Sequence, residues 1–221
     1  MCGRFVLISP FTLIAEEFRI RDGNGDLNPR YNIAPGQEIL AVLCEEGANR
    51  LYRLRWGLIP SWADDPSIGS RMINARAETV AQKPSFRSAF DKKRCLIVAD
   101  GFYEWRREGK RKSPVYVSMK SQKPFGFAGL YEIWHSPEGH EIRSGTIITT
   151  EANDLLRPVH DRMPVILPKE DEDRWLDPAA HDKNRLLALL RPYPAGKMRA
   201  HDVSPRVNTP ANDSSDNIKP L

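Results

Sequence analysis

The sequence has few of the features that mark membrane, secreted or zinc-binding proteins. Its 221 residues include only three cysteines, and none of them forms a CxxC pair. This usage argues against a disulfide framework or a structural zinc site and is typical of a reducing compartment. No apolar run approaches the ~18 residues that a membrane span needs, and the N-terminus lacks the pattern of a secretory signal. We therefore expect a cytoplasmic protein with no membrane partner, associated with the nucleoid when it is bound to DNA.

Common catalytic motifs are missing as well. The sequence contains no Walker loop and no GxGxxG, GxSxG or HExxH pattern, which removes several common enzyme classes. His135 and His140 lie in a Gly/Pro turn, which is a poor place for metal ligands. We expect neither a metal nor a cofactor.

Positive charge is concentrated in the middle of the chain. Overall, 33 Lys and Arg stand against 29 Asp and Glu, but the segment from Arg50 to Lys112 holds 15 basic and 7 acidic residues. Such a segment can neutralise nucleic-acid phosphates, and its tryptophans can stack on bases. Alternatively, aromatic residues beside Gly and Pro wedge loops onto a core, and the run RREGKRK reads as a solvated hairpin. That run is the weakest DNA-binding candidate.

The residue pattern predicts one α+β domain over residues 1–221. Strands rich in β-branched and aromatic residues are predicted over 2–8, 38–44, 50–56, 94–100, 101–108, 113–120, 125–134 and 142–152. The stretch 151–167 is predicted to form a turn of helix, a loop and another strand. Helices are predicted over 11–18, 85–93, 168–176 and 181–190. There is no βαβ alternation and no internal repeat, so we expect a curled antiparallel, barrel-like core flanked by short helices.

Two long stretches without regular structure, 21–37 and 56–79, exceed the ~12 to 15 residues usual for loops in a compact domain. They hold Tyr31, Met72 and Asn74 together with two tryptophans, so we expect them to line a site. The polar segment from about 205 onward is expected to lie extended over the surface or to be loosely ordered.

Cys2 directly follows the initiator methionine in MCGRF. Removal of Met1 would leave an α-amine, with a pKa near ~8, and a thiol, with a pKa near ~8.5, on one carbon framework. Such a pair can condense with an aldehyde to an imine and then close to a thiazolidine. A cysteine at this position also arises by chance and is then inert. Cys44 and Cys95 lie in apolar runs, where we expect inert core thiols.

Three polar residues lie among apolar neighbours. Asn74 in MINARAET could cap a short helix, and Glu104 in DGFYEW could face solvent from an amphipathic strand. If Glu104 faces inward instead, desolvation should raise its pKa toward neutrality, as a general acid or base requires. His160 in PVHDRMPV could equally be a satisfied structural histidine.

The sequence resembles a known family through motifs spread from residue 2 to about residue 207. They occur in the order MCGRF, RYNIAP, RWGLIPSW, INARAET, DGFYEW, TTEAN and VHDRMPVIL. This set is similar to the SRAP (SOS response-associated peptidase) family, whose members shield abasic sites in single-stranded DNA.

The resemblance implies a thiazolidine crosslink between mature Cys2 and the ring-opened sugar of an abasic site, with Asn74, Glu104 and His160 as the other catalytic residues. Asn74 would orient the amine and Glu104 would act as acid and base, while His160, assisted by Arg4, could favour the thiolate. A weak lyase activity at abasic sites is a secondary expectation. The same residues also fit a thiol autopeptidase or N-terminal-nucleophile amidohydrolase that removes Met1.

The expected partner is single-stranded DNA carrying abasic sites, bound by a monomer. The DNA-binding residues that we predict are Arg4, Asn32, Pro35, Trp62, Arg76, Trp105 and Arg162. Ala63 stands where some family members carry a second tryptophan, which removes one stacking contact from the expected set.

Overall fold

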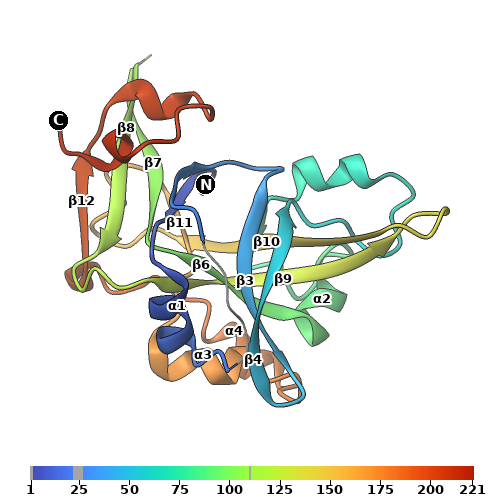
Figure 1. The fold of residues 1–221 in the computed structure, drawn as a ribbon. Helices are drawn as coiled ribbons and strands as arrows, with labels where there is room; N and C mark the ends of the chain where they lie inside the picture. Colours follow the sequence, from blue (N-terminus) through green and yellow to red (C-terminus); the bar gives the residue numbers. More distant parts are fainter. Residues whose placement is uncertain (1, 22–26, 110) are drawn as a thin grey trace.

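Five strands close into a barrel at the centre of the computed structural model, which describes residues 2–21, 27–109 and 111–221 (Figure 1). They are β3 (Glu38–Glu45), β4 (Ala48–Trp56), β6 (Arg94–Ala99), β9 (Phe125–His135) and β10 (Glu141–Glu151). Neighbours pair antiparallel in the order β4, β3, β6, β9 and β10, and β10 then pairs in parallel with β4. The α+β class and the curled, largely antiparallel barrel-like core are therefore confirmed.

A second sheet stands beside the barrel and carries the N-terminal strand. Its order is β12 (Met198–Asp202), β8 (Arg111–Met119), β7 (Gly101–Glu108), β1 (Phe5–Leu7) and β2 (Arg30–Ile33). Two further short strands flank β10, with β5 (Asn74–Arg76) parallel and β11 (Arg162–Pro164) antiparallel to it. Because β10 contacts both, it brings together two of the loops expected to form a site.

Short helices cover the outside of the barrel (Figure 1). They are α1 (Phe11–Phe18), α2 (Arg87–Lys92), α3 (Lys169–Leu176) and α4 (Lys183–Leu187). Of the 3-10 helices, η1 (Pro66–Arg71) lies between β4 and β5, whereas η2 (Ala195–Lys197), η3 (Pro205–Asn208) and η4 (Ser215–Ile218) contact the second sheet. Ile14 and Phe18 of α1 are buried, as their spacing predicts for an amphipathic helix. None of the described helices has the length and apolar character needed to cross a membrane.

The predicted loops contain more regular structure than expected. Strand β2 lies inside the predicted loop 21–37, of which residues 22–26 fall outside the described part of the chain. Strand β5 and helix η1 lie inside 56–79, and β12 has no predicted counterpart. These elements are short and polar. The strands among them form because distant strands pair with them, and local sequence patterns do not reveal such pairing.

The C-terminal segment is held against the second sheet. Val207 and Asn217 are buried, and the amide of buried Asn32 donates to the carbonyl oxygens of Val207 (3.1 Å), Thr209 (3.0 Å) and Asn212 (2.8 Å). One asparagine thus supplies hydrogen bonds to the polar backbone of this segment and holds it over the surface of the second sheet.

Candidate active site

Cys2 is positioned by strand pairing at the start of the chain. Phe5 pairs with Phe102, and the Tyr103 N–H donates to the Arg4 carbonyl at 3.0 Å, so residues 2–4 run alongside 103–105. Cys2 is fully buried there. This pairing places the cysteine next to the segment that carries Glu104.

Asn74 reaches Cys2 from the other side. It lies in β5, where it pairs with Ile147 of β10, so its interpretation as a helix cap is wrong. Its Nδ2 donates to the Cys2 carbonyl oxygen at 2.8 Å, and its buried Oδ1 accepts no hydrogen bond from any described residue. The amide therefore fixes the Cys2 backbone and keeps an acceptor available beside it.

Glu104 faces inward, with only 2% of its surface exposed, which excludes the solvent-facing alternative. Burial raises its pKa to about 7, and the negative charge of Asp161 adds to this effect. A carboxyl group with this pKa can accept and return a proton near neutral pH.

The Cys2 thiol is not activated by its surroundings. Burial and then the charge of Glu104 raise its pKa well above the ordinary value, although a hydrogen bond from the Arg4 backbone opposes the shift. The thiol is therefore protonated at neutral pH. This differs from the expectation that His160 and Arg4 would favour a thiolate.

His160 precedes β11 and is half-buried. Burial lowers its pKa, and the positive charges of Arg107 and Arg162 lower it further, against an opposing effect of Asp161. Its Nδ1 lies 2.7 Å from a carboxylate oxygen of Asp161, but also accepts the Arg162 backbone N–H at 3.0 Å. The Asp161 side chain is 86% exposed, so solvent screens its contact with the ring.

A cavity of about 300 Å³ brings Glu104 and His160 together, and its lining also contains Trp105, Arg107, Lys112 and Asn208. Of these added residues only Trp105 is predicted from the sequence. Arg107 and Lys112 belong to the run that reads as a solvated hairpin. The detectable signal is the two-residue spacing from Trp105 to Arg107, which puts both side chains on one face of a strand.

Two predicted DNA-binding residues, Arg4 and Asn32, make contacts within the protein. Arg4 Nη1 donates to Asn32 Oδ1 and to the Val207 carbonyl, both at 2.8 Å, and Nη2 donates to the Asn208 carbonyl at 3.0 Å. In this structure the pair ties the C-terminal segment to the wall of the cavity.

The other predicted DNA-binding residues are more accessible. Pro35 and Arg76 are exposed, and Trp62 has 59% of its surface exposed. Arg162 is the exception, because only 15% of its side chain is exposed and it donates two hydrogen bonds to Glu78, at 2.6 and 3.0 Å.

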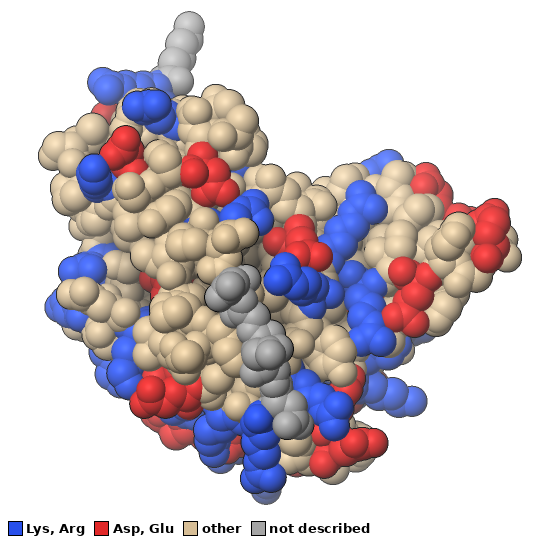
Figure 2. Space-filling model, viewed as in Figure 1, with Lys and Arg blue, Asp and Glu red and all other residues tan. Residues whose placement is uncertain are grey.

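Basic side chains lie on both sides of a hollow in the molecular surface. Figure 2 shows Lys and Arg around the tip of the β7–β8 hairpin and on the lobe across the hollow from it. A separate surface depression of about 470 Å³ is lined by Arg53, Arg55 and Arg143 together with Glu38 and Glu141. In that depression Arg53 is paired with Glu38 and Arg143 with Glu141, so the basic residues around the hollow are better suited to a polyanionic ligand.

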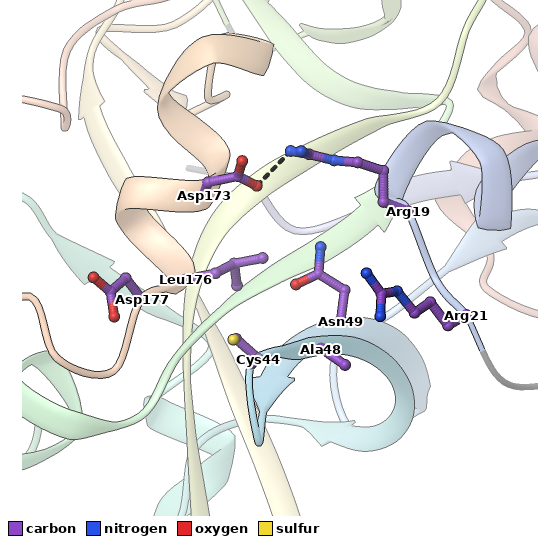
Figure 3. Close-up of a pocket in the computed structure, with 9 residues that line it drawn as sticks. Arg19, Arg21, Cys44, Ala48, Asn49, Asp173, Leu176 and Asp177 are labelled. Atoms are coloured by element: carbon purple, nitrogen blue, oxygen red, sulfur yellow. Dashed lines mark hydrogen bonds and ion pairs between the residues drawn. The ribbon is translucent and has the colours of Figure 1, made fainter.

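A second cavity of about 300 Å³ lies near α1, α3 and the β3–β4 turn, at the other end of the molecule from the hairpin tip (Figure 3). Cys44 lines this cavity and is half-buried, so it is not the core thiol expected, whereas Cys95 is fully buried. Burial raises the pKa of Cys44, and the charge of Asp177 adds to the shift. Across the cavity Arg19 pairs with Asp173. Among the described residues, no group of three or more His, Cys, Asp and Glu is arranged to hold a metal ion.

Comparison with known proteins places the chain in one family. The model of the SOS response associated peptidase (SRAP) family matches residues 1–210. The "Abasic site processing protein YoqW" of Bacillus subtilis is 51% identical over 99% of both chains, and the "Abasic site processing protein YedK" of Escherichia coli is 31% identical over 100% of both. A crystal structure of a protein from Bacteroides thetaiotaomicron, 29% identical, superimposes over 100% of both chains with a TM-score of 0.89. The chain belongs to the SRAP family.

Proposed function

We propose that this protein binds single-stranded DNA and shields abasic sites by a covalent thiazolidine crosslink to Cys2. The observation that carries the proposal is the buried Glu104, with a pKa of about 7, beside a cysteine whose backbone is held by Asn74. The names of the relatives, abasic site processing proteins, support the substrate class.

The reaction requires removal of Met1, which frees the Cys2 amine. The amine attacks the aldehyde carbon of the ring-opened sugar, and Glu104 takes the proton released from nitrogen. Protonated Glu104 then returns this proton as the hydroxyl leaves as water, which gives the imine. The thiol sulfur adds to the imine carbon, its proton goes to the imine nitrogen, and the thiazolidine ring closes. Aldehyde and aminothiol thus give the crosslink and one molecule of water.

Two other side chains support these steps. Asn74 orients the Cys2 backbone so that its amine points at the aldehyde, since an N-terminus is otherwise mobile. His160 lines the same cavity as Glu104, where its imidazole can hydrogen-bond to a sugar oxygen. The imine also acidifies the carbon beside it, so we propose a minor β-elimination (lyase) reaction.

The state of the thiol supports this order over peptidase chemistry. A thiol peptidase attacks with a thiolate and lowers the pKa of its cysteine accordingly. Here the pKa of Cys2 is raised by burial and by Glu104. A protonated thiol is compatible with attack by the amine first and ring closure second.

The test is a denaturing gel of the protein incubated with single-stranded DNA carrying one abasic site. We expect a shifted band with wild type and none with Cys2→Ala. Insertion of one residue between Met1 and Cys2 keeps the thiol but ties its nitrogen in a peptide bond, and should also abolish the band. No stable band with the wild-type protein, from which Met1 has been removed, would refute the proposal.

A further inference from the structure

Two cations face each other across the β7–β8 hairpin at the candidate active site. The strand register places Arg107 directly opposite Lys112, and both are exposed and line the cavity that contains Glu104 and His160. Like charges directly opposite in an antiparallel pair are destabilising. Within the described residues, neither cation has an ion-pair partner. The fold therefore keeps an unfavourable charge pair at this point.

Arg106, the neighbouring cation on the hairpin, is ion-paired within the chain. Arg106 points to the other face of β7 and is paired with Glu108 at 2.9 Å and with Asp202 at 2.8 Å. Arg106 is thus ion-paired within the chain, whereas the two cations Arg107 and Lys112 share their cavity with a single carboxyl group, that of Glu104. This contrast indicates that an anion from outside the protein completes the pair.

An oriented aromatic ring lies beside the two cations. Trp105 Nε1 donates to Asn208 Oδ1 at 2.7 Å, and the Asn208 carbonyl accepts from Arg4 Nη2 at 3.0 Å. Asn208 therefore fixes the indole from one side while Arg4 fixes Asn208. Aromatic rings next to cations are the combination that binds single-stranded nucleic acids, through stacking on the base and contact with the phosphate.

We propose that Arg107 and Lys112 clamp the backbone phosphate adjoining the abasic sugar, and that Trp105, oriented by Asn208, stacks on the base of the neighbouring nucleotide. One phosphate is assigned to both cations because directly opposed side chains start only about 5 Å apart. The proposal rests on the function proposed above, since it takes the abasic strand as the ligand of this cavity.

The test measures binding and not crosslinking, so that the two proposals can fail separately. The probe is single-stranded DNA with one tetrahydrofuran residue, an abasic analogue that lacks the aldehyde, and its affinity is measured by fluorescence anisotropy over a range of salt concentrations. For Arg107→Ala/Lys112→Ala we expect affinity about tenfold lower at low salt, and a slope of log affinity against log salt shallower by about 0.7, the value for one phosphate on a single strand. Asn208→Ala should weaken binding with the slope unchanged, because it loosens the indole and touches no phosphate.

A matched control removes the same two charges elsewhere. Arg87 and Lys92 are exposed on α2, far from the hairpin (Figure 1), and Arg87→Ala/Lys92→Ala should bind as wild type does. The hairpin variant should unfold at the wild-type temperature or slightly above, because it relieves a like-charge pair. Wild-type affinity and slope in the hairpin variant, or an equal loss in the control, would overturn the clamp. A weakened hairpin variant together with a wild type that forms no crosslink would leave the clamp standing and refute the proposed function.

Discussion

The two cavities described above have similar volumes and similar side chains, yet they differ in what they can do. Each measures about 300 Å³ and contains acidic and basic side chains; Cys44 lines one of them, and Cys2 lies buried next to the other. The Cys44 cavity is lined by two arginines, Arg19 and Arg21, and two aspartates, Asp173 and Asp177, and Arg19 is paired with Asp173. At the Cys2 cavity Arg107 and Lys112 have no ion-pair partner among the described residues. A cavity whose acidic and basic residues balance and whose lining has no aromatic ring offers little to a polyanion, whereas a cavity with two cations, one acid and a tryptophan does.

The two regions also each contain a buried glutamate. Burial raises the pKa of both Glu104 and Glu172 to about 7. Glu172, in α3, accepts a hydrogen bond from Lys169 Nζ at 2.8 Å, and Lys169 also contacts Glu17. Glu104 lies beside Cys2 in a cavity that also contains His160. A shifted pKa is therefore common to both regions, and the neighbouring groups decide which one serves a reaction.

The largest difference between the two glutamates is expected in the rate of crosslink formation when each is replaced by glutamine, which cannot exchange a proton. Glu104→Gln should slow crosslink formation by about 10²- to 10⁴-fold, the range for loss of a general acid or base, while DNA binding is retained. Glu172→Gln is the matched control and should react at the wild-type rate. Single-turnover kinetics on abasic single-stranded DNA measure both. Weaker DNA binding at an unchanged rate in Glu104→Gln would assign Glu104 a structural role.

A smaller effect is expected on the pH dependence of stability. A carboxyl group with a raised pKa binds its proton more tightly in the folded chain, so its contribution is complete below about pH 4.5 and is lost as the pH rises through about 7. As the pH rises above about 4.5, the free energy of unfolding of Glu104→Gln should therefore increase relative to that of wild type, and the difference should reach on the order of 3 kcal/mol at pH 8. Urea unfolding at pH 4.5, 6 and 8 checks this, and a constant difference across the series would contradict the buried state of Glu104.

The smallest effect concerns two asparagines with equivalent hydrogen bonds. Asn74 donates to the Cys2 carbonyl and Asn49 to the Phe18 carbonyl, both at 2.8 Å. Each Asn→Ala variant should lose about 1 kcal/mol of stability. Only Asn74→Ala should also slow crosslinking, by about tenfold, because it frees the Cys2 backbone. Equal crosslinking rates in the two variants would remove Asn74 from the mechanism.

Local patterns in the sequence predict the long elements and part of the site. The spacing of Ile14 and Phe18 predicts α1, and runs of β-branched residues predict the barrel strands. The placement of Glu104 between aromatic residues raises an inward orientation as one of two alternatives, and its burial resolves the choice.

Contacts between distant segments could not be predicted in this way. The barrel closes through the pairing of Arg55 with Ser144, and β2 and β12 exist because other strands hydrogen-bond to them. Likewise, Arg4 contacts Asn208 only in the folded chain. The strand register that places Arg107 opposite Lys112 is also set only in the folded chain. The sequence alone therefore predicts no more than a charged hairpin exposed to solvent.

The central claim is that the amine and the thiol of Cys2 react together. The most direct measurement is mass spectrometry of the crosslinked protein after nuclease digestion, iodoacetamide treatment under denaturing conditions and proteolysis. We predict an N-terminal peptide that begins at Cys2, carries the sugar with loss of one water, and takes up no iodoacetamide at its sulfur. A sugar-bearing Cys2 peptide whose thiol is still alkylated, or a sugar attached to any other residue, would contradict the account.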